Sequence, residues 1–93
     1  MINSNSYFEG NVLSLGYTTA AGKSTVGVME PGSYEFGTGS AEVMTVIEGE
    51  MEVVLPGETE SKMFGKGEFY EVPANSKFQV TVNVQTSYLC QYS

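Results

Sequence analysis

Residues 42–56 decide the fold, because their side chains alternate in character from one residue to the next. The stretch reads EVMTVIEGEMEVVLP. Side chains of a β-strand point alternately to opposite faces, so this period of two predicts two strands, one on each side of Gly49. Gly49 has acidic neighbours and fits a tight turn, and Pro56 ends the second strand because proline donates no ladder hydrogen bond. The stretch therefore predicts a central β-hairpin.

The rest of the chain repeats the same kind of signal at short intervals. Alternating runs separated by Gly and Pro turns predict roughly eight short strands and no helix. Residues Met1 to Ser6 are polar, and we expect them to be frayed or to pair with a partner subunit. Besides the two around Gly49, strands are expected within Tyr7–Thr18, Ser24–Met29, Tyr34–Thr38, Lys62–Phe64, Phe69–Val72, Phe78–Val82 and Ser87–Tyr92.

Such a chain has to protect the edges of its sheets, and closure into a barrel or a double sheet does this. We predict an all-β fold, a cupin-type jelly-roll barrel of short antiparallel strands. At 93 residues the chain has the length of one domain, which we place at residues 1–93. A domain of this size has a small core, so we also expect a homodimer.

Composition excludes several classes of function. The chain has eleven glutamates, four lysines, no arginine and no histidine, and its net charge is −7. Nucleic-acid binding needs cations that neutralise phosphates, so we expect no nucleic-acid partner. No apolar run has the length of a membrane span, and the N-terminus lacks the pattern of a signal peptide. The single cysteine, Cys90, cannot form an internal disulfide, which favours the cytoplasm.

Two spacings are similar to the motifs of cupins, G-x5-H-x-H-x3/4-E-x6-G and G-x5-P-x-G-x2-H-x3-N. Glu42 and Gly49 have the E-x6-G spacing, and Gly67 and Pro73 have the G-x5-P spacing. The histidine positions of these motifs fall on Phe36, Thr38 and Phe78, so only Glu42 remains of the four usual metal ligands. One carboxylate does not hold a transition metal, and we expect neither a metal nor another cofactor.

Longer strings resemble one family, the small single-domain pyrimidine/purine nucleoside phosphorylases, which are short bacterial cupins. The resemblance runs from about Tyr7 to Tyr92. It implies a pentosyltransferase that converts a purine or pyrimidine nucleoside and inorganic phosphate to free base and ribose 1-phosphate, reversibly and with broad base tolerance. The strings that carry it are STVGVM at 24–29, GSYEFGT at 32–38, EVMTVIEG at 42–49, VPANSKF at 72–78 and SYLCQY at 87–92.

Phosphorolysis passes through a cation-like sugar, and this chemistry suggests roles for particular residues. Glu42 would stabilise the sugar cation or bind ribose hydroxyls, with Thr38 as a hydroxyl donor beside it; Glu42 could equally be a vestige of a metal site. Lys23 is the candidate for phosphate, or else an exposed lysine that promotes solubility. The aromatic residues expected around the base, which could instead fill the barrel core, are Tyr34, Phe36, Phe78 and Tyr88.

Two other functions are compatible with the same fold. A non-catalytic cupin module would hold a small sugar or nucleoside without converting it. A metal-dependent cupin oxygenase or isomerase would need ligands, and a chain without histidine supplies few of them. Fold alone does not choose among these functions, so nucleoside phosphorylase is the prediction on the strength of the resemblance.

Overall fold

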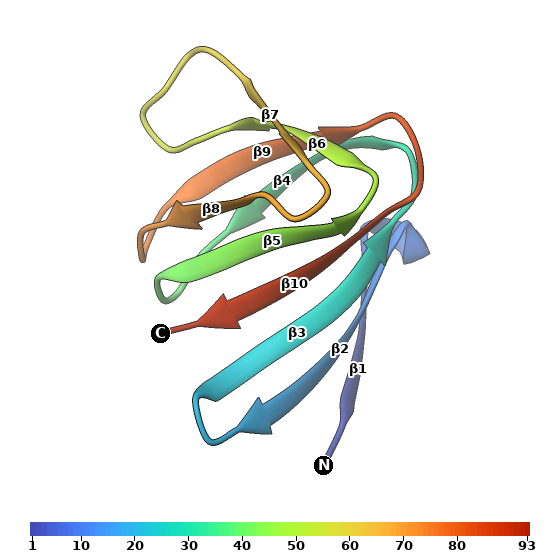
Figure 1. Cartoon of the computed structure of the whole chain (residues 1–93), viewed down its shortest axis with the longest axis vertical. Coiled ribbons are helices and arrows are strands. Elements are labelled where there is room, and N and C mark those ends of the chain that lie inside the picture. Colours follow the sequence, from blue (N-terminus) through green and yellow to red (C-terminus); the bar gives the residue numbers. More distant parts are fainter.

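The computed structural model describes all 93 residues and consists almost entirely of β-strands (Figure 1). The only helix is a three-residue 3-10 turn, so no helix of the chain could span a membrane. The elements are β1 (Asn3–Tyr7), η1 (Phe8–Gly10), β2 (Val12–Thr19), β3 (Gly22–Met29), β4 (Gly32–Gly37), β5 (Glu42–Glu48), β6 (Glu50–Val54), β7 (Lys62–Gly65), β8 (Phe69–Val72), β9 (Lys77–Val82) and β10 (Thr86–Tyr92).

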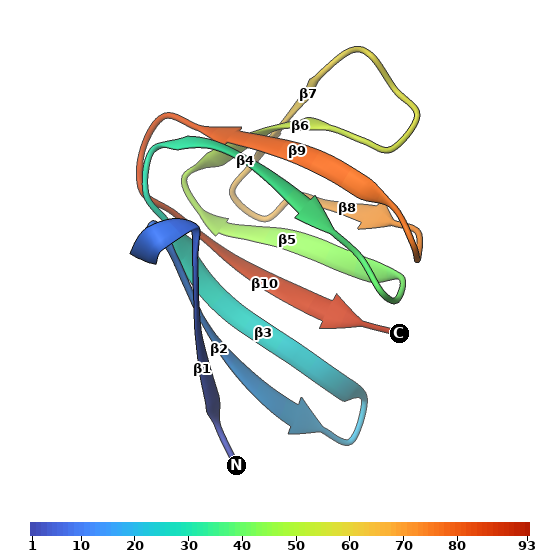
Figure 2. The same ribbon diagram turned by 180° about the vertical axis from the view of Figure 1, so that it is seen from behind.

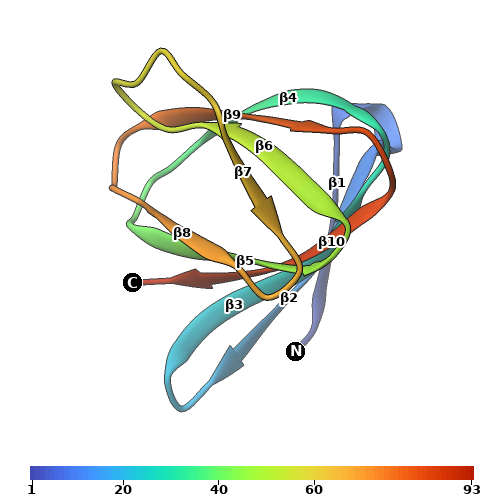
Figure 3. The same ribbon diagram turned by 45° about the horizontal axis from the view of Figure 1, so that its top comes forward.

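The strands form two antiparallel sheets that face each other. One sheet has six strands in the order β1-β2-β3-β10-β5-β8, and the other has four in the order β4-β9-β6-β7. Figure 3 shows the two sheets enclosing the interior of a barrel. The inward side chains form one apolar core of fourteen buried residues, which includes Met29, Val46, Met51 and Val80. The predicted all-β antiparallel architecture is confirmed.

The turn at Gly49 is present, but the two strands that flank it do not form a hairpin. β5 pairs with β10 and β8, whereas β6 pairs with β7 and β9, so the chain changes sheets at Gly49. Gly49 has a φ of +92°, and a Cβ atom there would lie 3.1 Å from the Thr86 backbone. A residue with a side chain would be strained and crowded at this corner, so glycine is what lets the chain cross from one sheet to the other.

The N-terminal segment is ordered differently from the prediction. Residues 3–6, expected to be frayed or to pair with another subunit, belong to β1 and pair with β2 of the same chain, from Asn3 opposite Gly16 to Tyr7 opposite Val12. Asn and Ser have low β-propensity, which is why no strand was predicted there. Main-chain hydrogen bonds to β2 hold this polar strand at the edge of the sheet, where polar side chains are well suited.

The two sheets differ in width, and this leaves part of one uncovered. Figures 1 and 2 show β1 and β2 extending beyond the area that the four-stranded sheet faces. The inner face of this extension is polar and includes Asn3, Asn5 and Lys23. The outer face of β2 and β3 is apolar, with Leu13 opposite Val28 and Leu15 opposite Val26.

The η1 turn between β1 and β2 has an unusual backbone. Phe8 and Glu9 have φ values of 53° and 58°, in the left-handed region that side chains disfavour by about 1–2 kcal/mol per residue. Asn11 holds the turn, because both its backbone N–H and its side-chain amide donate to the Phe8 carbonyl, at 3.2 and 3.0 Å. The turn places the Phe8 ring against Tyr34 and Phe36 of β4.

Candidate functional site

A cavity of about 400 Å³ lies between the two sheets, beside the η1 turn. Nine of its fifteen lining residues are hydrophobic, counting the tyrosines and the cysteine. The polar groups of the lining are hydroxyls, one thiol and two carboxyl groups, and no lysine is present. The fifteen lining residues are Tyr7, Phe8, Ser14, Thr25, Met29, Glu35, Phe36, Gly37, Gly39, Glu42, Met44, Phe78, Tyr88, Cys90 and Tyr92.

Glu42 is the buried carboxyl group of this cavity. It is the first residue of β5, shares the inward face with Met44, and is only 9% exposed. Burial raises the pKa of its carboxyl group, and a hydrogen bond from the Cys90 thiol opposes that shift. Burial and the nearby Glu42 charge raise the pKa of Cys90 to about 12, so the thiol stays protonated near neutral pH and acts as a donor.

Hydroxyl groups form one wall of the cavity, on β2, β3 and β10. The Thr25 and Tyr92 hydroxyls are 3.2 Å apart, and Ser14 and Tyr88 line the same side of the cavity. Burial raises the pKa of Tyr88 to about 12, so its hydroxyl remains protonated at neutral pH. A Cβ atom at Gly27 would lie 2.5 Å from the Tyr88 hydroxyl, so this glycine leaves the space that the ring occupies.

Aromatic rings form the opposite wall, on η1, β4 and β9. Phe36 stacks on Phe78 with ring centroids 5.6 Å apart, and Phe8 meets Phe36 edge-on at 5.5 Å. The row continues through Tyr70 into the core. The cavity is thus polar on one side and aromatic on the other, which suits a ligand with a hydroxylated part and a flat ring.

Four of the residues predicted from sequence lie together in this cavity: Glu42, Phe36, Phe78 and Tyr88. Tyr34 lies behind the aromatic wall, where its ring packs against Phe8 and Phe36 and its hydroxyl donates to the Glu30 carbonyl.

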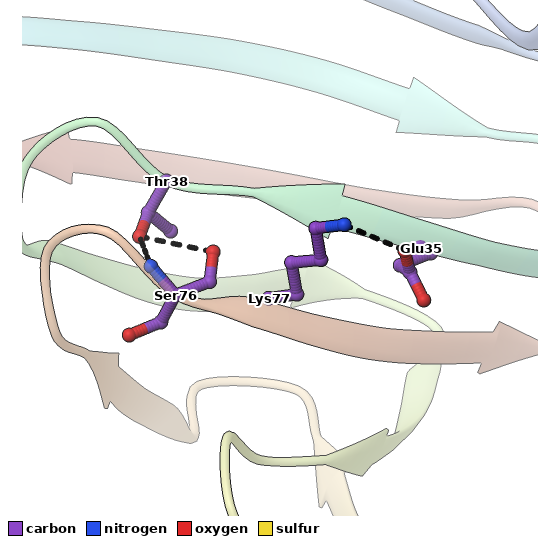
Figure 4. Close-up of polar contacts among 4 residues, drawn as sticks. All are labelled: Glu35, Thr38, Ser76 and Lys77. Atoms are coloured by element: carbon purple, nitrogen blue, oxygen red, sulfur yellow. Dashed lines mark hydrogen bonds and ion pairs between the residues drawn. The ribbon is translucent and has the colours of Figure 1, made fainter.

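Thr38 is not among the lining residues, because its hydroxyl is used within the fold. It donates to the Pro73 carbonyl at 2.7 Å. It also accepts from the Ser76 N–H at 3.0 Å (Figure 4). Thr38 therefore joins the loop after β4 to the loop before β9. Glu35, which lines the cavity, forms an ion pair with Lys77, and the N–O distance is 3.9 Å; Figure 4 shows this pair.

Lys23 lies in a polar groove next to the cavity. The groove lies on the inner face of β1, β2 and β3, where the four-stranded sheet does not cover it. Lys23 is the only cationic side chain that lines the groove. Cavity and groove share three lining residues, Tyr7, Thr25 and Tyr92. Lys23 also precedes Thr25 by two positions on β3, so both belong to the same face of the sheet.

Several cavity residues were not predicted from the sequence. The shared face of Tyr88, Cys90 and Tyr92 in the last strand was visible as alternation, and it could have placed Cys90 and Tyr92 beside Tyr88. Phe8 gave no such signal, because its position depends on a left-handed turn that no sequence pattern marks.

The residues at the cupin ligand positions do not fit a metal ion. Phe36, Thr38 and Phe78 offer no charged ligand, and no three His, Cys, Asp or Glu side chains come together anywhere in the structure. Glu42 and Cys90 alone fall short of the three or four protein ligands of a typical site.

The two-sheet barrel is found in solved structures of cupins. An RmlC-like cupin from Shewanella frigidimarina matches with a TM-score of 0.75 at 15% identity, covering 100% of this chain and 84% of that one. A cupin superfamily protein from Desulfitobacterium hafniense matches with a TM-score of 0.71 at 13% identity, covering 96% and 80%. The protein has the cupin fold, as predicted.

The sequence comparisons are more specific than the fold. The pyrimidine/purine nucleoside phosphorylase family matches residues 2–92. Proteins of that name from Tolumonas auensis and Pseudomonas syringae are 53% and 51% identical over 92 residues, covering 99% of each chain. A solved structure from Vibrio parahaemolyticus, described as of unknown function, is 43% identical with a TM-score of 0.96, covering 100% and 99%. The chain belongs to the pyrimidine/purine nucleoside phosphorylase family.

The raised pKa of Glu42 predicts how stability depends on pH. Folding favours the protonated form of this carboxyl group. The contribution of Glu42 to the free energy of unfolding is therefore complete below its unfolded-state pKa of about 4.5, and it is lost as the pH rises through its folded-state pKa. Glutamine stays neutral, so Glu42→Gln should gain melting temperature relative to the unmodified protein between about pH 4 and about pH 8. Thermal unfolding across this range measures the difference.

The matched control is Glu48→Gln, which changes an exposed carboxyl on the same strand. It should follow the unmodified protein at every pH. If the difference in melting temperature between Glu42→Gln and the unmodified protein is the same at every pH, burial does not disfavour the ionised form of Glu42.

Proposed function

We propose that the protein is a nucleoside phosphorylase of broad base tolerance, which converts a nucleoside and inorganic phosphate to free base and ribose 1-phosphate. Membership of the family supports the reaction, and the cavity supports the substrate class. The observation that carries the proposal is a buried carboxyl group, Glu42, between a wall of hydroxyls and a wall of aromatic rings. A nucleoside has the same division, with a hydroxylated sugar and a flat base.

The two walls orient the substrate. Phe36 and Phe78 line the side of the cavity that holds the base, and an aromatic surface suits purines and pyrimidines alike because every base has a π-face. Tyr88, Tyr92 and Thr25 hydrogen-bond the ribose hydroxyls on the opposite side. In this arrangement the cavity selects the sugar more strongly than the base.

Glu42 acts on the developing charge of the sugar. As the C1′–N bond breaks, its electron pair leaves with the base and positive charge grows on the sugar ring. In its ionised form the Glu42 carboxylate stabilises this charge, and the Cys90 thiol, which donates to it, opposes the rise in pKa that burial causes. A phosphate oxygen then forms the new bond to C1′, and the proton that the phosphate loses goes to the departing base, which leaves as the neutral free base.

Phosphate enters from the polar groove. The nucleophile attacks C1′ from the side opposite the departing base, and the groove adjoins the hydroxyl wall, away from the aromatic wall. Lys23 supplies the positive charge there, and the Thr25 and Tyr92 hydroxyls lie where groove and cavity meet. Thr38 and Tyr34 contribute by holding the loops and rings around the site.

A second candidate function has one observation in its favour. No cationic side chain lines the cavity itself, which disfavours a phosphate dianion inside it. A non-catalytic cupin module that binds a small sugar or nucleoside would need no such charge.

Incubation with adenosine or uridine, with and without inorganic phosphate, separates the two functions. We expect phosphate-dependent release of free base and formation of ribose 1-phosphate, both measured by chromatography. Glu42→Gln should lower kcat/KM by at least about tenfold, since it removes the charge that stabilises the sugar cation. Glu48→Gln is the control and should be unchanged. Nucleoside binding without base release would instead identify a binding module.

Lys23→Met tests the route of phosphate. Loss of one charge-assisted contact should raise the KM for phosphate by about 5- to 10-fold. The KM for the nucleoside should stay unchanged. Initial rates at varied phosphate concentration measure the effect. Lys66→Met, which removes an exposed lysine between β7 and β8, provides the control. Equal phosphate KM values for both variants would exclude Lys23 as a phosphate ligand.

We further propose a cytoplasmic homodimer that acts in nucleoside salvage. The apolar outer face of β2 and β3 supports the dimer, since Leu13 and Leu15 are 55% and 48% exposed beside Val26 and Val28. Contiguous exposed apolar residues mark interaction surfaces. Reduced Cys90 is compatible with the cytoplasm.

Sedimentation or light scattering should give the mass of a dimer for the unmodified protein. Leu15→Glu puts a charge into the outer face and should yield monomers, because an unpaired charge is costly to bury. Met63→Glu changes an exposed residue on the four-stranded sheet and should leave the dimer intact. A monomer at all concentrations of the unmodified protein would contradict the proposal.

A further inference from the structure

Phe8 occupies a position that the core does not explain. It lines the cavity from the η1 turn, yet its side chain is 41% exposed, an unusual placement for a large apolar ring. By comparison, Phe78 is buried in the core and Phe36 is partly buried against it. Phe8 is therefore the phenylalanine of the cavity with the most contact with solvent, next to Tyr7, which lines the cavity and is 47% exposed.

The turn that carries Phe8 is fixed in an unfavourable conformation. Phe8 and Glu9 are both left-handed without being glycine, and two hydrogen bonds from Asn11 hold the Phe8 carbonyl. The Glu30 N–H donates to the Asn11 carbonyl and ties the turn to the end of β3. Strained backbone that the surroundings hold in place is concentrated at functional sites.

The ring geometry leaves the Phe8 faces free of stacked neighbours. Phe8 is tilted by 49° to Tyr34 and lies at 86° to Phe36, so neither ring is parallel to it. In contrast, Phe36 and Phe78 already stack on each other at 28°. Among the phenylalanines that line the cavity, Phe8 is thus the one without a parallel ring stacked on it.

We infer that Phe8 stacks on the base of the bound nucleoside and is a determinant of base tolerance, an inference that rests on the proposed function. The lining residues include no Asn, Gln, Lys or Arg, and, apart from Glu35, the side chains that can hydrogen-bond lie on the six-stranded sheet, the side that we propose for the sugar. Contact through the ring face is indifferent to this pattern, so one site accepts purines and pyrimidines. Phe8 acts on substrate binding, whereas Glu42 acts on bond cleavage.

Phe8→Leu and Phe8→Tyr test this role by steady-state kinetics with adenosine and with uridine. Leucine keeps apolar bulk but has no ring face, so the KM should rise about tenfold for both nucleosides, with kcat changing less than about twofold. Tyrosine keeps the ring and should restore the KM. The control, Phe69→Leu, alters a phenylalanine that is 60% exposed on β8 and does not line the cavity.

Direct binding of adenosine and of free adenine, followed by NMR or calorimetry, gives a readout that does not depend on turnover. Adenine should bind the unmodified protein and Phe8→Tyr but more weakly to Phe8→Leu. If Phe8→Leu fails to fold by circular dichroism, Phe8→Met replaces it as an apolar variant without a ring.

The outcomes separate this inference from the proposed function. If the unmodified protein releases base and the leucine or methionine variant has the same KM and adenine affinity, the role of Phe8 is overturned and the phosphorylase stands. If the unmodified protein neither binds nor cleaves any nucleoside, both are overturned. A higher KM that tyrosine restores supports the inference.

Discussion

The fold depends on the corner at Gly49, where the chain leaves one sheet and enters the other. The left-handed φ of Gly49 and the close approach of Thr86 leave no space for a side chain. Because of this corner, β5 does not pair with β6. It faces β6 and the other strands of the four-stranded sheet across the core. The inward residues of β5 and β6, from Glu42 to Val53, then contribute to both sides of one core. A hairpin in a single sheet would not enclose a cavity.

The site follows from the difference between the two sheets. The wider sheet contributes Glu42, the hydroxyls and Cys90, and the narrower sheet contributes the stacked rings of Phe36 and Phe78. Burial between them has an electrostatic cost, which appears in the raised pKa of the Glu42 carboxyl. A carboxyl group kept at such a cost, with a thiol donor beside it, is typical of a functional position. The uncovered part of the wider sheet adds a polar groove that contains Lys23.

Local pattern indicated some of the residues that line the cavity and gave no sign of others. The cupin motif spacing placed Glu42, Phe36 and Phe78 at former ligand positions, and all three line the cavity, as does Tyr88. Thr38 was expected beside Glu42, but its hydroxyl bonds to Pro73 and Ser76, residues far away in the sequence. Phe8 and the groove next to Lys23 depend on how β1, β2 and η1 pack, and pairing of this kind leaves no periodic signal in a polar segment.

The sequence by itself determined the all-β class, most of the strand positions and the family, because alternation, turn residues and long shared strings are local properties of the chain. Only the tertiary structure decided that β5 and β6 lie in different sheets, that β1 pairs within its own chain, and which side chains share the cavity. The physical reason is that strand pairing and burial are set by contacts between segments distant in sequence. Glu42 and Cys90 come together through the pairing of β5 with β10, and the rings of Phe36 and Phe78 face them only when the two sheets close on each other.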